Sequence, residues 1–306
     1  MTLPARTLEI RTSPHLLSGY SVDTIMFNVV LALVPTTLFA IYAFGLTALL
    51  TLVTALGSCL ATEWALCRAA ARRTTLGDWS VTITGLLYGL TLPPGLPLWM
   101  VAAGGLISVG LGKALFGGLG QNPFNPALVG RAVLQAAFPV AMTSWIPAFV
   151  TGRFSTLPGS TLTLPFSTPR YDGVTTATPL QAWKFDRELA ETADLALGYV
   201  SGSVGETSSL LILLGGLYLI ARKMMNWRIP VAILATVAAI AGLLHAVAPD
   251  RYASSPFMLF SGGLMLGAIF MATDMVGSPM TGSGCVIYGA LIGVLVVVIR
   301  VWGGMP

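Results

Sequence analysis

The sequence predicts an all-α, polytopic membrane protein, and two observations about its composition lead there. Of its 306 residues, 55% are hydrophobic and only 9% are charged, which is more apolar surface than one soluble core of this size hides. The apolar segments are also long enough for helical spans, whereas the strands of a membrane β-barrel give short runs that alternate with polar positions. Transmembrane helices are therefore the expected building blocks.

Hydropathy predicts about nine spans. They lie near residues 24–45, 46–67, 79–93, 98–118, 127–150, 207–221, 229–248, 256–272 and 284–302. No cleavable signal peptide is visible in residues 1–23, where prolines and charges replace the apolar run of a leader, so the first span is the expected insertion signal.

Basic loops predict the orientation. Arginines follow the second span, and a further basic cluster follows the sixth: Arg68, Arg72 and Arg73, then Arg222, Lys223 and Arg228. Both loops belong in the cytoplasm by the positive-inside rule. We therefore expect a cytoplasmic segment 1–23, a first transmembrane repeat 24–150, an extracytoplasmic loop 151–206 and a second repeat 207–306, in a bacterial inner membrane.

Charge and cysteine usage exclude other classes of partner. The net charge of +4 is explained by the basic loops, so nucleic acid is not an expected partner. The three cysteines, Cys59, Cys67 and Cys285, lie in apolar segments without CxxC spacing, which argues against a zinc site or an iron–sulfur cluster held by this chain alone.

A weak internal similarity predicts inverted repeats. Residues 84–97 and 261–279 are both apolar helices that end in a Gly/Pro turn, and an offset of five spans means that the two copies cross the membrane in opposite directions. Broken helices at matching positions free backbone groups for an ion or ligand. The expected ion-coupling candidates are Pro93, Pro94, Asp274 and Ser278. A chance match between two Gly-rich membrane helices explains the same similarity.

Six ionisable residues lie within or at the ends of predicted spans: Glu63, Lys113, Arg131, His245, Asp274 and Arg300. Such groups are functional candidates by default. Arg131, His245 and Asp274 are close enough to span ends to snorkel, cap or lie at the interface.

Two polar stretches carry the other candidates. Lys113 opens a Gly-rich run with Asn122 and Asn125, whose Asn-Pro pairs cannot continue a helix; it suits a flavin ring or a phosphate, although it lacks the spacing of a dinucleotide fingerprint or a P-loop. The second stretch, "YDGVTTATPL" at 171–180, has three threonines and by composition alone is an ordinary turn.

Several separate motifs resemble one family along nearly the whole chain. They are "SPHLLSGYSVDTIMFNVV", "LPPGLPLWM", "GKALFGGLGQNPFNPALVGRAVL", "FPVAMTSW", "DGVTTATPL" and "FMATDMVGSPMTGSGCVIYGALIG". Together they resemble the RnfD family, a membrane subunit of the Rnf electron-transport complex. The sister family, NqrB of the sodium-translocating NADH:quinone oxidoreductase, shares the broken helices and the "FMATD" motif, while the "GQNPFNPA" loop and the "MTSW" ending favour Rnf.

The resemblance implies a flavoprotein subunit of a translocase. In both families a threonine in a stretch like "DGVTTATPL" carries FMN through a phosphoester bond, and Thr178 is the matching residue. The residues around it would be read by a separate flavin transferase: Asp172, Gly173, Thr175, Ala177 and Pro179. A second flavin such as riboflavin is a further implication, without an assigned position.

At the level of the complex, the resemblance implies electron transfer between ferredoxin and NAD coupled to pumping of Na⁺ or H⁺, with ferredoxin and NAD chemistry on partner subunits. The chain departs from the family in ending at Pro306, before the tenth span, and in placing Met275 where proline usually follows the aspartate. The competing hypothesis is a passive channel or carrier on the same inverted-repeat fold, for which a flavin-attachment threonine has no use.

Overall fold

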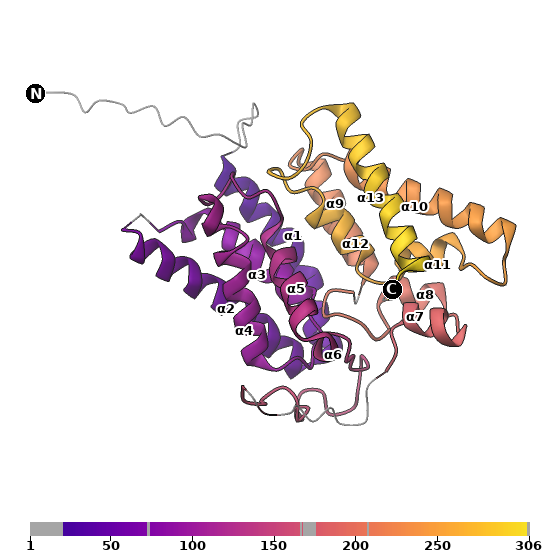
Figure 1. The fold of residues 1–306 in the computed structure, drawn as a ribbon, viewed down its shortest axis with the longest axis horizontal. Coiled ribbons are helices and arrows are strands. Elements are labelled where there is room, and N and C mark those ends of the chain that lie inside the picture. Colours follow the sequence, from indigo (N-terminus) through magenta and orange to yellow (C-terminus); the bar gives the residue numbers. More distant parts are fainter. Residues whose placement is uncertain (1–20, 72–73, 166, 168–175, 207, 305–306) are drawn as a thin grey trace, which may run out of the picture.

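The computed structural model describes residues 21–71, 74–165, 167, 176–206 and 208–304, and every regular element in these ranges is helical (Figure 1). The predicted all-α class is thereby confirmed for the described residues. Asp172, Gly173 and Thr175 lie outside them.

The amino-terminal half forms one group of helices. These are α1 (Val22–Phe44), α2 (Leu46–Ala69), the short η1 (Leu76–Asp78), α3 (Ser80–Leu90), α4 (Leu98–Gly110), η2 (Ala114–Phe116), α5 (Pro126–Ala137) and α6 (Pro139–Met142). Within this group α2 packs extensively against α3 and α4, and α4 packs against α5.

The carboxyl-terminal half forms a second group, preceded by a long connection with three short elements. The connection carries α7 (Pro179–Gln181), a π-helical turn η3 (Ala182–Asp186) and α8 (Thr192–Leu197). The second group is α9 (Ser209–Ala221), α10 (Arg228–Val247), α11 (Ser255–Phe260), α12 (Leu264–Leu266), the π-helical η4 (Gly267–Met271) and α13 (Gly282–Trp302). Figure 1 shows the two groups side by side, with α7 and α8 at one end.

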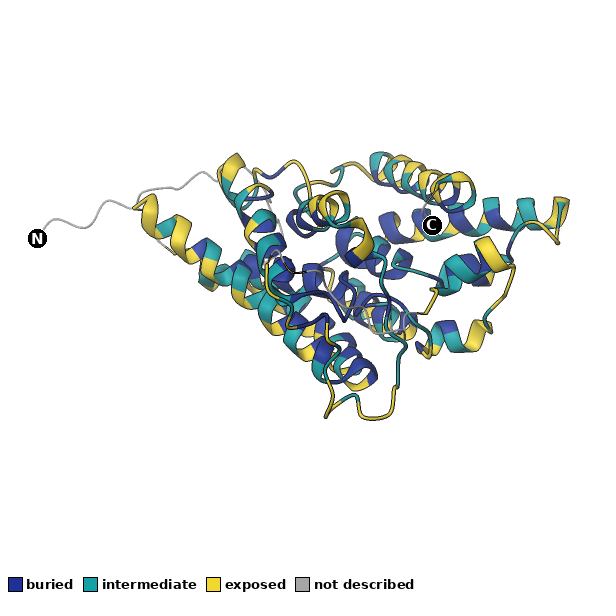
Figure 2. Ribbon diagram, turned by 60° about the horizontal axis from the view of Figure 1, so that its bottom comes forward, coloured by how far each residue is buried: buried dark blue, intermediate teal, exposed yellow. Residues whose placement is uncertain are grey.

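Contacts between α1 and α9 join the two groups. Tyr218 on α9 donates a hydrogen bond from its hydroxyl to the Asn28 side-chain oxygen on α1 at 2.5 Å, and Asn28 is buried. One apolar cluster includes residues of both groups, from Ile25 on α1 to Met271 on η4, and a second cluster lies within the carboxyl-terminal part of the described chain. Figure 2 shows the dark, buried faces of the helices turned toward one another and the exposed faces turned outward.

Within the residues that the structure describes, five segments are long and apolar enough to cross a membrane: α1, α2, Leu98–Phe116, α10 and α13. Two shorter apolar helices, α3 and α9, accompany them. Many large apolar side chains on these helices are exposed, for example Leu38 and Leu243, as expected for surfaces that face lipid. The chain is a multi-pass membrane protein by the length and composition of its helices.

Two predicted spans are interrupted in the structure. The span expected at 127–150 is helical only to Met142 and changes direction at Phe138, because proline at 139 disfavours helical backbone in the preceding residue. The span expected at 256–272 is broken between Phe260 and Leu264, where Gly262 has a positive φ of 63°. The break therefore lies inside this span, whereas the sequence predicted it at the Gly/Pro turn that follows.

The helix bundle has two ends that organise the sites below. The end where residues 143–165 and 176–206 lie is here called the loop side: the backbone N–H of Phe149 donates to the Ala43 carbonyl at 2.8 Å, and that of Leu46 to the Arg153 carbonyl at 2.9 Å. Gly45, between α1 and α2, has a φ of 69°, and a Cβ there would lie 2.1 Å from the Arg153 oxygen. The opposite end, where α1 begins, is called the start side.

Candidate functional site

Thr178 begins the short helix α7. Its hydroxyl oxygen accepts a hydrogen bond from the Gln181 backbone N–H at 3.3 Å, and its own N–H donates to the Gln181 side-chain oxygen at 3.1 Å. Pro179 occupies the first helical position, where a missing N–H costs nothing. The next residue, Leu180, is buried. This capping box holds Thr178 half-buried in a defined place on the loop side.

Thr178 lies on the wall of the wide cavity, a space of about 1180 Å³ between the two groups of helices. One wall comes from α5 and the segment after α6, the opposite wall from α12, η4 and α13. The charged residues on these walls are Arg131, Glu206, Asp274 and Arg300. Arg131, which the sequence placed near a span end, is the sixth residue of α5 and lies on this wall.

The two arginines of this cavity differ in their partners. Arg300 is buried and donates to two backbone carbonyls at the break in the second group, those of Met258 at 2.5 Å and Ser261 at 2.7 Å. Its role is thus to satisfy the carbonyls that the broken helix leaves free. Arg131 interacts electrostatically with Glu206, and no residue of the described segments accepts a hydrogen bond from its guanidinium.

A second donor on the same wall also lacks a partner. Trp145 is only 8% exposed, and its indole Nε1–H has no hydrogen-bond acceptor among the described residues. Its carbonyl oxygen accepts a hydrogen bond at 3.1 Å from the N–H of Thr176, two residues before Thr178. A buried indole N–H usually finds an acceptor, so this orphan donor is informative.

The narrow cavity, of about 100 Å³, brings four of the predicted residues together at the start side. Its walls include Lys113, Asn122, Asn125 and Asp274. Asn122 is buried and hydrogen-bonds both the Phe124 carbonyl, at 3.1 Å, and the Asp274 carboxylate. This bond crosses between the two groups of helices. Asn125 instead caps α5, accepting from the Ala127 N–H at 3.0 Å.

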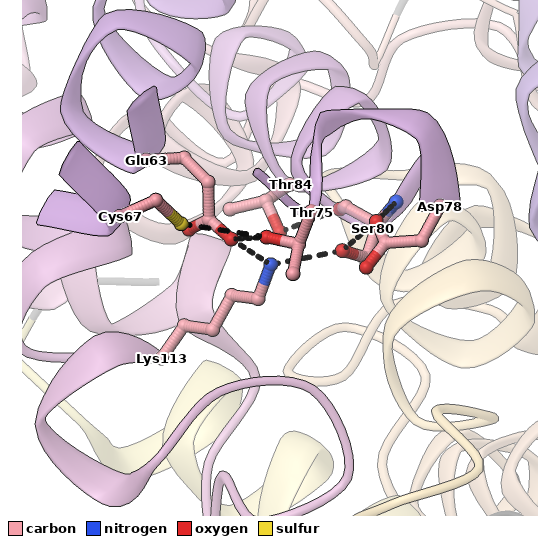
Figure 3. A network of polar contacts seen from close by, with 7 residues as sticks. All are labelled: Glu63, Cys67, Thr75, Asp78, Ser80, Thr84 and Lys113. Carbon is pink, nitrogen blue, oxygen red and sulfur yellow. Dashed lines mark hydrogen bonds and ion pairs between the residues drawn. The ribbon is translucent and has the colours of Figure 1, made fainter. Parts of the chain in front are cut away.

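Lys113 belongs to a buried polar network that joins α2, α3 and the end of α4 (Figure 3). Its ammonium lies 2.8 Å from the Glu63 carboxylate and donates to the Ser80 hydroxyl at 2.9 Å. Ser80 in turn donates to Asp78 at 2.6 Å, and Thr75 donates to Glu63. Lys113 therefore has its charge compensated within this network and is not a free cation.

The remaining predicted residues do not join these sites. Pro93 and Pro94 are buried beyond the carboxyl end of α3, whereas Ser80 at its first residue lines the narrow cavity. Neither proline lines a cavity that Asp274 lines, so the structure does not bring these predicted residues together. Ser278 lines neither cavity; its N–H donates to the Asp274 carbonyl.

Sequence reasoning missed three features of the site. The unpaired Trp145, Glu206 and the pairing of Glu63 with Lys113 each depend on contacts between distant segments. The sequence singled out Glu63 and Lys113 one at a time, as charged residues within apolar spans, and did not predict that they pair. His245, in the last turn of α10 with Nδ1 2.7 Å from the Tyr252 carbonyl, lies at a span end as predicted.

The chain is similar to known proteins over almost its whole length. Residues 9–306 match the model of the NQR2, RnfD, RnfE family. The chain is 40% identical to the D-type subunit of the ion-translocating oxidoreductase complex of Halorhodospira halophila, covering 97% of this chain and 88% of that protein.

Two further relatives have names that specify the translocated ion. The identity is 39% to the D-type subunit of the proton-translocating ferredoxin:NAD(+) oxidoreductase complex of Clostridium ljungdahlii, covering 97% of this chain and 87% of that protein. It is 38% to the Na(+)-translocating counterpart of Acetobacterium woodii, with 98% and 87% covered. A match of this extent shows that the chain belongs to the NQR2, RnfD, RnfE family.

Proposed function

We propose that this protein is the membrane subunit of an Rnf-type, ion-translocating ferredoxin:NAD oxidoreductase complex and that it carries FMN in a phosphoester bond to Thr178. Membership of the family and the names of the relatives support the first part. The second part is supported by the position of Thr178, the acceptor predicted from the motif, on the wall of the widest described cavity. The partners would be the other subunits and, during maturation, a flavin transferase.

The residues around Thr178 fit a flavin. Small-molecule sites usually enclose about 300–1,000 Å³, so a cavity of about 1180 Å³ is large enough. A covalent tether needs only the hydroxyl, which the capping box presents at the start of α7 without committing its proton to an acceptor. Bound FMN would supply one- and two-electron transfer, and the chain would hold and orient it.

Flavin attachment is tested by fluorescence of the denatured chain. Protein made together with the flavin transferase should show a fluorescent band on a denaturing gel. Thr178→Val keeps the side-chain shape and should abolish the band, whereas Thr176→Val, two residues away, is the matched control and should retain it. A fluorescent Thr178→Val band would place the flavin elsewhere and refute the assignment.

The orientation proposed here follows the basic loops: an amino terminus in the cytoplasm of a bacterial inner membrane and the loop side outside. The flavin would then be held at the outer side, and electrons would pass to or from carriers on partner subunits. A second flavin such as riboflavin remains part of the proposal without an assigned site.

Asp274 is the proposed coupling residue for Na⁺ or H⁺. It is a carboxylate beside a helix end, it lines both cavities, and it bonds Asn122 of the other group of helices. A change in its protonation or cation binding would therefore act on the contact between the groups. Asp274→Asn should reduce ion pumping by the complex more than its electron transfer; equal loss of both activities, or of neither, would contradict this role.

A further inference from the structure

The wide cavity contains two hydrogen-bond donors that have no acceptor among the residues that the structure describes, and they lie on the walls that Thr178 shares. Trp145 Nε1 is buried and unpaired, and the Arg131 guanidinium has no hydrogen-bond acceptor among the described residues. Unsatisfied donors in an apolar surrounding cost free energy, and native proteins rarely keep them without a ligand, an ion or a water to bind. Both donors therefore indicate an acceptor-rich occupant.

The hydrogen bonds of the wall leave Arg131 as the donor to an occupant. Arg300 donates to the Met258 and Ser261 carbonyls, and the carboxylates of Glu206 and Asp274 balance the two arginine charges. The guanidinium of Arg131 has no hydrogen-bond acceptor in the described segments, and the oxygens of a phosphodiester or of a flavin ring would supply acceptors.

We propose that Trp145 and Arg131 hold the flavin carried by Thr178 inside the wide cavity, Trp145 donating to a phosphodiester oxygen and Arg131 facing the N1–C2=O edge of the ring. This inference rests on the proposed attachment to Thr178. Trp145 is assigned to the phosphate because the Thr176 N–H binds its carbonyl, which keeps it beside the attachment segment. Arg131, on α5, is assigned to the ring.

The position of Arg131 sets the redox behaviour. A flavin bound there would supply two-electron transfer with uptake of one proton, and its reduction would add negative charge at the edge that faces Arg131. The electrons come from the complex's own carriers, or from the electrode in a titration. A guanidinium at this edge stabilises the reduced anion more than the neutral oxidised ring, so it raises the potential and keeps N1 unprotonated.

The first test titrates the covalent flavin in the full chain, purified in detergent after noncovalent flavin is washed away. Arg131→Gln should lower the preference for reduced flavin about tenfold, which is about 30 mV for a two-electron couple. Proton uptake per two electrons should also rise from one toward two, seen as a steeper dependence of potential on pH. Arg131→Lys should restore most of the potential.

Arg187→Gln is the matched control, because Arg187 is an exposed loop-side arginine that does not line the wide cavity. It should leave the potential and its pH dependence unchanged. If Arg131→Gln and Arg187→Gln behave alike, Arg131 does not face the ring and the inference is overturned.

A second test measures how well iodide quenches the flavin. In the unaltered chain the ring should be quenched about fivefold less than free FMN. Trp145→Phe, which keeps an aromatic ring but removes the N–H and part of the indole volume, should recover much of that difference, the size expected for one net hydrogen bond. Quenching equal to that of free FMN would overturn the inference even if no variant folded. A chain with no flavin on Thr178 would refute the proposed function as well, whereas a flavin that is present but exposed would refute only this inference.

Discussion

At the residue scale, the structure separates charges that serve the fold from charges that face a site. Glu63 and Lys113 form a buried ion pair: the Lys113 side chain is 4% exposed and the Glu63 side chain 7%. The hydroxyl groups of Thr75 and Ser80 give the pair further hydrogen bonds. Burying two charges is expensive, but once they are paired, the loss of one partner costs far more than the loss of both.

Removal of one member of this pair should therefore be more damaging than removal of both. We expect Glu63→Gln or Lys113→Gln alone to lower the free energy of unfolding by about 3–5 kcal/mol, because each leaves an uncompensated buried charge. The double variant should recover a large part of that loss. Thermal melts in detergent measure this; a double variant at least as unstable as the sum of the single ones would contradict the pairing.

The sequence located both members of this pair, because ionisable residues stand out in apolar spans, but it gave no indication that they meet across 50 positions of chain. The same limit applies to Trp145, whose unpaired N–H becomes informative only when its surroundings are known. The motif around Thr178 was recognised from resemblance, while its capping of α7 is visible only in the structure.

At the element scale, hydropathy located the long helices to within a few residues. The spans expected at 24–45, 46–67, 229–248 and 284–302 correspond to α1, α2, α10 and α13. The interrupted spans were not predicted, because an apolar stretch has the same hydropathy whether its helix continues or breaks. Pro139 and Gly262 are the local causes, and glycine in particular is too common in membrane helices to mark a break by itself.

The turn between α1 and α2 gives an element-scale prediction. Gly45→Ala places a Cβ at positive φ and against the Arg153 carbonyl, so it should destabilise the chain by more than about 2 kcal/mol and loosen residues 149–153 from the bundle. Gly57→Ala, on an open face in the middle of α2, is the matched control and should stabilise by about 0.5–1 kcal/mol. Thermal melts of both variants, with limited proteolysis of the 149–153 segment, check this; similar effects at the two sites would contradict it.

At the scale of the whole molecule, the two groups of helices meet along α1 and α9 and enclose the wide cavity, so a ligand there contacts both. Thr178 at the start of α7 and Asp274 after η4 line the same cavity from different elements. The proposed cofactor and the proposed coupling residue would therefore lie against the same cavity. The long helices α1, α2, α10 and α13 and their order were predictable from sequence, whereas the cavity between the groups depends on how they pack.

The proposed orientation predicts which surfaces an impermeant thiol reagent reaches in intact cells. In a Cys67→Ser background, Ser155→Cys on the exposed loop side should be labelled, and Ala221→Cys at the end of α9 should be protected until the membrane is opened. The native Cys59 and Cys285 are buried and should not interfere. Labelling of Ala221→Cys but not of Ser155→Cys would show that the topology is the reverse of the one proposed.

The most direct test of the account is peptide mass spectrometry of protein made together with the flavin transferase. The account predicts that the peptide containing residues 176–181 carries the mass of FMN less water, with fragment ions that assign it to Thr178. An unmodified Thr178, or the flavin on Thr175 or Thr176, would contradict the account.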